Sequence, residues 1–359
     1  MLRLIAASLA LAIVSVVPVH AQSSASELNE AGWKMLEKGD AVRAAQLFDQ
    51  ALAQRPDEPV LLFGASVSAQ VLNRPSDAKP KLRHALDVNP RFTPASLLLG
   101  EIVYREGDLD AAIKTYEAAL ALSPGNPDLS TRLHQWRQEA DVHSTLVERR
   151  QDRFRVMFEG RSDAALAAHA TDALNTAFWR VGQELRAYPV NPIQVILYTE
   201  KQFRDITRAP EWSGGVYDGR IRIPLAGATR SLPLLDRVLV HELTHAIIAA
   251  ISGRRIPSWL NEGLAQYFEG EDPEAARRRL KAVGRTIPLR SLEQGFGRFD
   301  ALQAQIAYDE SLLAVGVMMD RPGFGWHVLL SRLAGGQTFA DAIPNFGFSY
   351  EDLEAGFKR

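Results

Sequence analysis

The 359-residue sequence predicts two folds in series, an all-α solenoid of helical repeats followed by an α+β domain with a small sheet. A 34-residue repeat over residues 25–126 indicates the solenoid. β-Branched runs appear after residue 150 and then give way to helical patterns, an order typical of α+β domains. A chain of this length is long enough for two domains.

The repeat is visible at five slots, each filled three times at intervals of 34 residues. Small residues let paired helices approach closely, a large side chain fills the space between them, and a proline ends the second helix. One unit cannot bury its own apolar face, whereas three stacked units can. The slots hold Gly32, Ser66 and Gly100; Ala44, Ala78 and Ala112; Phe48, Leu82 and Tyr116; Ala51, Ala85 and Ala119; and Pro56, Pro90 and Pro124.

This spacing resembles the tetratricopeptide repeat, a helix–turn–helix unit. The resemblance implies a concave surface that binds a peptide, a substrate or a partner protein, with a spacer role as the alternative. Residues 127–150 begin with Pro-Asp and are polar, so we expect one helix there that caps the solenoid and links it onward.

The N-terminus predicts a secretory signal peptide over residues 1–21, because Arg3 precedes an apolar run and the segment ends in Val-His-Ala. A membrane anchor is the alternative, but the run is short for a bilayer span. We therefore expect a periplasmic or secreted protein with no stable membrane span after cleavage. The absence of cysteine fits a bacterial periplasm and excludes thiolate metal ligands. A formal net charge of −2 gives no reason to expect a nucleic-acid partner.

The second domain is expected over residues 151–359. Its elements follow from alternation, β-branched runs and turn residues. We expect strands at 154–160 and 192–199, a hairpin at 214–225 around Asp218-Gly219, helices at 163–187 and 234–252, and mostly helices over 257–359.

The predicted helix 234–252 carries the motif His-Glu-x-x-His. His241 and His245 are four positions apart, which places both imidazoles on one helix face, about 6 Å apart along the axis. Two such histidines with an adjacent glutamate are the arrangement of two zinc ligands and a general base, here Glu242. A catalytic zinc needs a third protein ligand and one open position. Glu262 lies 17 positions after His245 and can return on a second helix to face both histidines.

The segment from His241 through Trp-Leu-Asn-Glu-Gly-x-Ala-x-Tyr-x-Glu resembles the gluzincin metallopeptidases. The resemblance implies a zincin-like domain in which His241, His245 and Glu262 bind Zn²⁺ and Glu242 is the general base. Glu269 matches a carboxylate that supports a ligand histidine. The later segment "IAYDESLLAVGVMM" resembles the peptidase-MA-like subgroup, whose domain often follows tetratricopeptide repeats in secreted bacterial chains.

The expected function is zinc-dependent hydrolysis of peptide bonds. Glu242 would take the proton of the attacking water and deliver it to the leaving amine. Tyr308 is the candidate donor to the oxyanion, with His327 as the second candidate. Tyr308 as a core aromatic and His327 packed beside Trp326 remain the alternatives.

Two further alternatives bear on activity. Gluzincin aminopeptidases carry a glutamate in a G-x-M-E-N element, whereas "GGVYDG" has none, so endopeptidase action is expected and Asp218 is interpreted as a turn residue. The alternative function is a non-catalytic repeat scaffold with a structural zinc site. That site would need a fourth protein ligand, for which Asp272 or Glu269 would serve. His84, His134, His143 and His169 show no ligand spacing.

Overall fold

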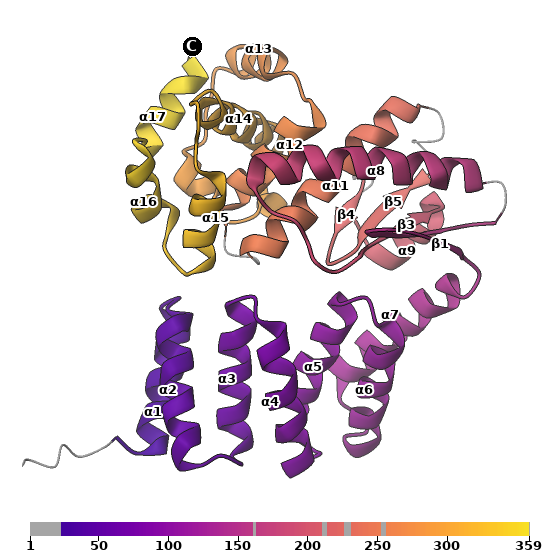
Figure 1. Cartoon of the computed structure of the whole chain (residues 1–359), viewed down its shortest axis with the longest axis vertical. Helices are drawn as coiled ribbons and strands as arrows, with labels where there is room; N and C mark the ends of the chain where they lie inside the picture. Colours follow the sequence, from indigo (N-terminus) through magenta and orange to yellow (C-terminus); the bar gives the residue numbers. More distant parts are fainter. Residues whose placement is uncertain (1–22, 161–162, 210–213, 226–230, 253–255, 359) are drawn as a thin grey trace, which may run out of the picture.

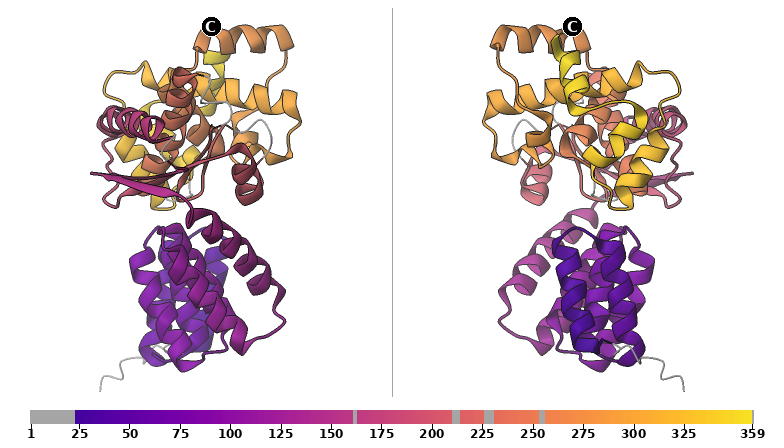
Figure 2. Two further views of the ribbon diagram at one scale, coloured as in Figure 1. Left: turned by 90° about the vertical axis from the view of Figure 1, so that its right-hand side faces the viewer. Right: turned by 90° about the vertical axis from the view of Figure 1, so that its left-hand side faces the viewer.

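The computed structural model describes residues 23–160, 163–209, 214–225, 231–252 and 256–358. A helical solenoid and a mixed α/β part lie end to end, and the chain passes from one to the other after α7 (Figures 1 and 2). The expected signal peptide, 1–21, lies outside the described residues. Within them, no helix combines the length and apolar character needed to cross a bilayer.

The solenoid is a stack of helical hairpins in which α1 packs on α2, α3 on α4 and α5 on α6 (Figure 1). Its helices are α1 (Ala25–Glu37), α2 (Ala41–Gln54), α3 (Pro59–Val71), α4 (Pro75–Val88), α5 (Thr93–Arg105), α6 (Leu109–Leu122) and α7 (Pro127–His143).

The small and large slots of the repeat meet in the solenoid core. An added Cβ would lie 2.8 Å from the buried Phe48 ring at Gly32 and 2.3 Å from the buried Tyr116 ring at Gly100. Trp136 of α7 stacks on Tyr104 of α5, with ring centroids 4.9 Å apart, and so closes the stack. The predicted all-α repeat solenoid is confirmed.

The prediction of one helix over residues 127–150 is wrong for the last residues of this segment. α7 ends at His143, and Val147–Gln151 forms β1, which pairs antiparallel with β2 (Phe154–Phe158). Three of the five β1 residues are charged and four are exposed, so no hydrophobic alternation marks the strand. Pairing with β2 through a turn at Asp152, where φ is +46°, decides the structure instead.

The sheet has five strands in the order β1-β2-β3-β5-β4. β3 (Ile193–Tyr198) runs parallel to β2 and to β5 (Ile221–Pro224), and β4 (Val216–Tyr217) pairs antiparallel with β5 at the edge. Alternate β3 residues face two cores. Val195 and Leu197 pack on the α8 side (Ala164–Leu185), whereas Ile196 and Tyr198 pack with Phe203 of α9 (Glu200–Thr207).

Helices follow the sheet, and the first of them packs against its strands β4 and β5. α11 packs against α8, β4, β5 and α12, and α12 packs against α14. Gly263 permits the last contact, because an added Cβ would lie 2.3 Å from the Ser311 carbonyl oxygen. The predicted α+β domain is thereby confirmed. These elements are α11 (Leu232–Ser252), α12 (Ser258–Glu269), α13 (Pro273–Val283), η1 (Leu289–Leu292), η2 (Phe296–Arg298), α14 (Ala301–Met319), α15 (Trp326–Ala334), α16 (Phe339–Ala342), η3 (Ile343–Phe346), α17 (Tyr350–Ala355) and η4 (Gly356–Lys358).

Candidate metal centre

The two histidines of the motif project from one face of α11. Their ring centroids are 4.8 Å apart, and the neighbouring Leu239, Leu243 and Ile247 are fully buried on the other faces of the helix. This burial fixes the helix, while the imidazoles of His241 and His245 keep only 20% and 11% of their surface exposed. The helix therefore holds both rings in a fixed position that is largely shielded from solvent.

Glu262 of α12 completes a group of three ligand atoms. Its Oε2 lies 3.6 Å from His241 Nε2 and 3.7 Å from His245 Nε2, and all three atoms lie within 4.8 Å of one another. In a tetrahedral zinc site with bonds of about 2.0–2.1 Å, ligand atoms are roughly 3.3–3.4 Å apart. The two nitrogens and one carboxylate oxygen thus fit a zinc ion by both chemistry and spacing.

Glu269 orients the first histidine from behind. His241 Nδ1 donates to Glu269 Oε2 at 3.2 Å, and Arg237 holds the other carboxylate oxygen at 3.2 Å. A donor proton on Nδ1 turns the Nε2 side of the ring toward Glu262 Oε2 and the space between the three ligand atoms. Burial alone would lower the pKa of His241, but hydrogen bonds to Glu262 and Glu269 raise that pKa well above its usual value. The excess of carboxylate around the imidazoles favours a cation.

The Glu242 carboxyl is buried beside this group and under β4. An added Cβ at Gly215 would lie 2.9 Å from Glu242 Oε1, so the edge of the sheet passes directly over the side chain. Burial raises the pKa of Glu242 to about 7, with His241 opposing the rise and Glu262 adding to it. A carboxylate of this basicity is suited to accept a proton near neutral pH.

Of the two oxyanion donors predicted from the sequence, one lies in the cleft and the other does not. Tyr308 of α14 lines the same cleft as Glu242, and burial keeps its pKa above the usual value, so the phenol stays a hydrogen-bond donor. Its ring also packs edge-on against Phe296, 5.3 Å away. His327 is exposed on α15 and is not among the described residues that line the cleft.

Neither proposed fourth ligand joins the group of three. Asp272 is the N-cap of α13 and accepts from the backbone of Glu274, and Glu269 is bound to His241 Nδ1 and Arg237. Within the described residues, the ligand group contains His241, His245 and Glu262 alone. The sequence did not point to Arg237 or to its second partner Glu271, because nothing in the spacing connects them to the motif.

Glu269 offers a direct test of the supporting contact. Substitution Glu269→Gln is expected to weaken zinc affinity by about 10–100-fold, since outer hydrogen-bond partners of ligand histidines have effects of this size. Competition with a chromophoric chelator measures the affinity. Glu271→Gln is the matched control, because Glu271 also pairs with Arg237, whereas among the described residues the carboxylate paired with His241 Nδ1 is that of Glu269. Equal affinities in the two variants would contradict the role of Glu269.

Comparisons with known proteins agree with this architecture. Residues 170–359 match the family model of the Peptidase MA superfamily, and residues 63–127 match a tetratricopeptide repeat model. Among curated proteins, the Protein STIP1 homolog of Dictyostelium discoideum is 28% identical over 109 residues, which are 30% of this chain and 19% of that protein. The chain therefore spans about a fifth of that relative's length.

Two solved structures resemble parts of the chain. The first TPR of Spaghetti (RPAP3), bound to the HSP90 peptide SRMEEVD, is 24% identical with a TM-score of 0.31, and covers 33% of this chain and 96% of its own. The UNC-45 chaperone, described for binding and folding muscle myosin, is 13% identical with a TM-score of 0.32, and covers 87% of this chain and 38% of its own. Both scores are too low to establish a shared overall fold. The superfamily match at 170–359, by contrast, spans more than half of the chain and contains the whole ligand group, so this protein belongs to the Peptidase MA superfamily.

Proposed function

We propose that the protein is a zinc-dependent endopeptidase, exported to the periplasm or the exterior, whose repeats recruit a substrate or a partner protein. The observation that carries the proposal is the convergence of His241, His245 and Glu262, with the Glu242 carboxyl buried beside them in a cleft. Two histidines and a glutamate are a donor set of catalytic zinc sites.

Each side chain has a role that its position supports. A zinc ion held by the three ligands would polarise the scissile carbonyl and acidify water. Glu242 accepts the proton of the attacking water and returns it to the leaving amine. Tyr308 donates a hydrogen bond to the oxygen on which negative charge develops, for which its protonated phenol is suited.

Endopeptidase action is supported by the surroundings of Asp218. Arg222 Nε donates to Asp218 Oδ2 at 3.0 Å, so this carboxylate is already paired and is poorly placed to bind the free amine of a substrate. The scaffold alternative would require a fourth protein ligand, and the described part of the chain brings three together.

Export and recruitment rest on separate observations. The pattern of residues 1–21 and the absence of cysteine support export, and N-terminal sequencing of the mature protein would test cleavage after Ala21. The tetratricopeptide match supports protein binding by the repeats.

Removal of one ligand tests the metal assignment. Glu262→Ala is expected to lower zinc affinity by more than about 100-fold, the upper end for loss of an outer partner, and to abolish peptide cleavage. Metal analysis and hydrolysis of a peptide library measure the two effects, and a phenanthroline chelator should silence the wild type. Glu274→Ala, on the exposed surface of α13, is the control. Wild-type protein that holds zinc but cleaves no peptide would contradict the enzyme proposal and favour the scaffold.

A further inference from the structure

The cleft in front of the ligand group is built from both parts of the chain. Its volume is about 1460 Å³, and its lining includes His241, Glu242 and Glu262 together with residues from the segments 214–219 and 245–250. Further lining residues come from 189–194, from α12 and α14, and from the solenoid, at the turn after α3 (residues 70–75) and the turn after α5 (102–107). The repeats therefore border the same space as the candidate catalytic residues.

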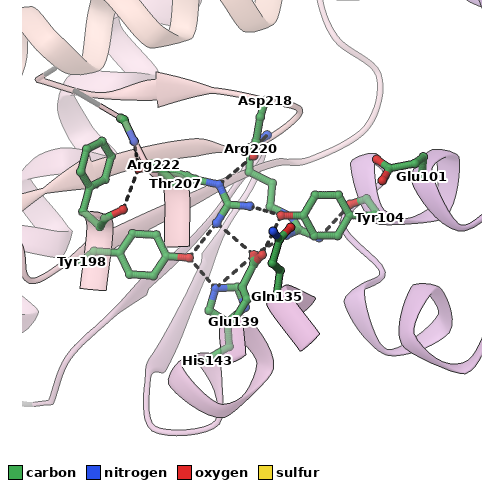
Figure 3. A network of polar contacts seen from close by, with 12 residues as sticks. Glu101, Tyr104, Gln135, Glu139, His143, Tyr198, Thr207, Asp218, Arg220 and Arg222 are labelled. Atoms are coloured by element: carbon green, nitrogen blue, oxygen red, sulfur yellow. Dashed lines mark hydrogen bonds and ion pairs between the residues drawn. The ribbon is translucent and has the colours of Figure 1, made fainter. Parts of the chain in front are cut away.

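The two walls are joined by direct contacts at two separate places. At one, Asn73 Nδ2 in the α3–α4 turn donates to the Ala249 carbonyl oxygen of α11 at 3.1 Å. At the other, Glu139 of α7 accepts from Arg220 at 2.7 Å and forms an ion pair with Arg222 at 2.9 Å, both from the β4–β5 hairpin (Figure 3). The solenoid is thus fixed against α11 and against the edge of the sheet.

The second join is a buried network rather than a surface contact. The Tyr104 hydroxyl of α5 donates to the Glu139 carboxylate at 2.6 Å. The backbone carbonyl oxygen of Tyr104 accepts from Arg220 at 2.7 Å. Arg222 donates to the hydroxyls of Tyr104 and Tyr198 at 2.7 and 2.8 Å (Figure 3). The side chains of both arginines are at most 2% exposed. Arg220 Nε has no hydrogen-bond partner among the described residues, but the other contacts pair most of the buried polar groups, and a network paired to this extent holds a fixed geometry.

The β4–β5 hairpin connects this network to the candidate general base Glu242. Arg222 lies opposite Val216 in the β4–β5 ladder, and the preceding Gly215 lies against the Glu242 side chain. The position of the solenoid wall is consequently fixed relative to Glu242 through a few residues of one hairpin.

We infer that the solenoid turns at 70–75 and 102–107 form a substrate-binding surface of this cleft, and that its ligand is an extended, unfolded stretch of polypeptide. The volume exceeds the roughly 300–1,000 Å³ of small-molecule pockets. Walls joined at two places restrict the access of a compact domain to the metal centre, whereas an extended chain, which advances about 3.3 Å per residue, needs less width. This inference rests on the proposed peptidase function and names its class of substrate.

A bulky side chain on the solenoid wall tests the inference. Val71, at the end of α3, lines the cleft and is 36% exposed, whereas Val88, at the end of α4, is 45% exposed and is not among the described lining residues. The probes are unfolded casein and a short synthetic peptide that spans one bond cleaved in it. Val71→Trp is expected to lower the ratio of kcat/KM for casein to that for the peptide at least tenfold. Val88→Trp should leave the ratio unchanged.

Binding separates this inference from the proposed function. In the Glu242→Gln background, labelled casein should bind at least tenfold more weakly to the Val71→Trp protein than to the Val88→Trp protein. It should also protect the amides of 70–75 and 102–107 from hydrogen exchange in the Glu242→Gln protein. If wild type cleaves nothing but this binding difference appears, the peptidase proposal fails, whereas the solenoid turns stand as a surface that binds unfolded polypeptide. Absence of binding, or equal effects of the two tryptophans on binding and on cleavage, would overturn the inference.

Discussion

With Gln in place of Glu242, the protein is expected to keep its zinc and to lose about 10²–10⁴-fold in kcat/KM, the range that a general acid–base residue contributes. Glutamine has the shape of glutamate, so it fits beneath Gly215 as the native side chain does. The amide cannot accept the proton of the attacking water. Because the ligand group consists of His241, His245 and Glu262, metal binding should survive. Peptide kinetics together with zinc stoichiometry measure both parts of the prediction.

Glu310 provides the matched control for this substitution. It is a fully buried carboxyl on α14 that accepts from the Ile287 amide at 2.8 Å, and burial raises its pKa to about 8. At neutral pH this carboxyl is mostly uncharged, so Glu310→Gln replaces one neutral group with another. Glu310 is not among the described residues that line the cleft. The Glu310→Gln protein should retain zinc and activity. A Glu242→Gln protein as active as the Glu310→Gln protein would exclude Glu242 as the base.

The sequence predicted the parts of the site that local geometry determines. The four-residue spacing of His241 and His245 places them on one helix face, and the length of chain before Glu262 allows a second helix to return to them. The 34-residue period likewise predicted which small residues meet Phe48 and Tyr116, because each repeat uses the same contact.

What the sequence did not predict depends on contacts between distant segments. Glu139 and Arg220 are 81 positions apart, and no periodicity connects a polar helix to an arginine on a β5 strand. α7 reads as a solvated cap, although one of its carboxylates is buried. His143 has no ligand spacing, and its Nε2 instead lies 2.7 Å from the Tyr198 hydroxyl. Strand β1 was missed for the same reason, since only its pairing with β2 distinguishes it from a charged helix.

Removal of the Glu139 carboxylate is expected to be the most destabilising change at the junction between solenoid and sheet. Glu139→Ala leaves Arg220 and Arg222 buried without their shared anion, and loss of one partner of a buried pair costs about 3–5 kcal/mol. Urea unfolding followed by tryptophan fluorescence measures the loss. Trp136 is a suitable reporter, because its ring stacks on Tyr104 of the network.

The pH dependence of the same variant gives an independent check. Burial alone would raise the pKa of Glu139, but Arg222 and Arg220 hold that pKa below its usual 4.5. A carboxyl whose folded-state pKa is depressed contributes its full stability above the unfolded pKa, and the contribution is lost as pH falls through the folded value. The difference in unfolding free energy between wild type and Glu139→Ala should therefore be constant near neutral pH and shrink below about 4.5.

Glu101, another carboxylate of the solenoid, provides a control that compares the buried network with a partly exposed ion pair. Glu101 pairs with Arg132 at 2.7 Å, but their side chains are 24% and 40% exposed, and the ion pairs of the described residues join neither of them to the hairpin. Glu101→Ala should cost only about 0–1 kcal/mol, as exposed pairs do. Amide exchange in residues 215–223 should quicken in Glu139→Ala and stay unchanged in Glu101→Ala, because Arg222 pairs across the ladder with Val216. Equal stability and exchange in the two variants would mean that the hairpin beside Glu242 is held by the sheet alone.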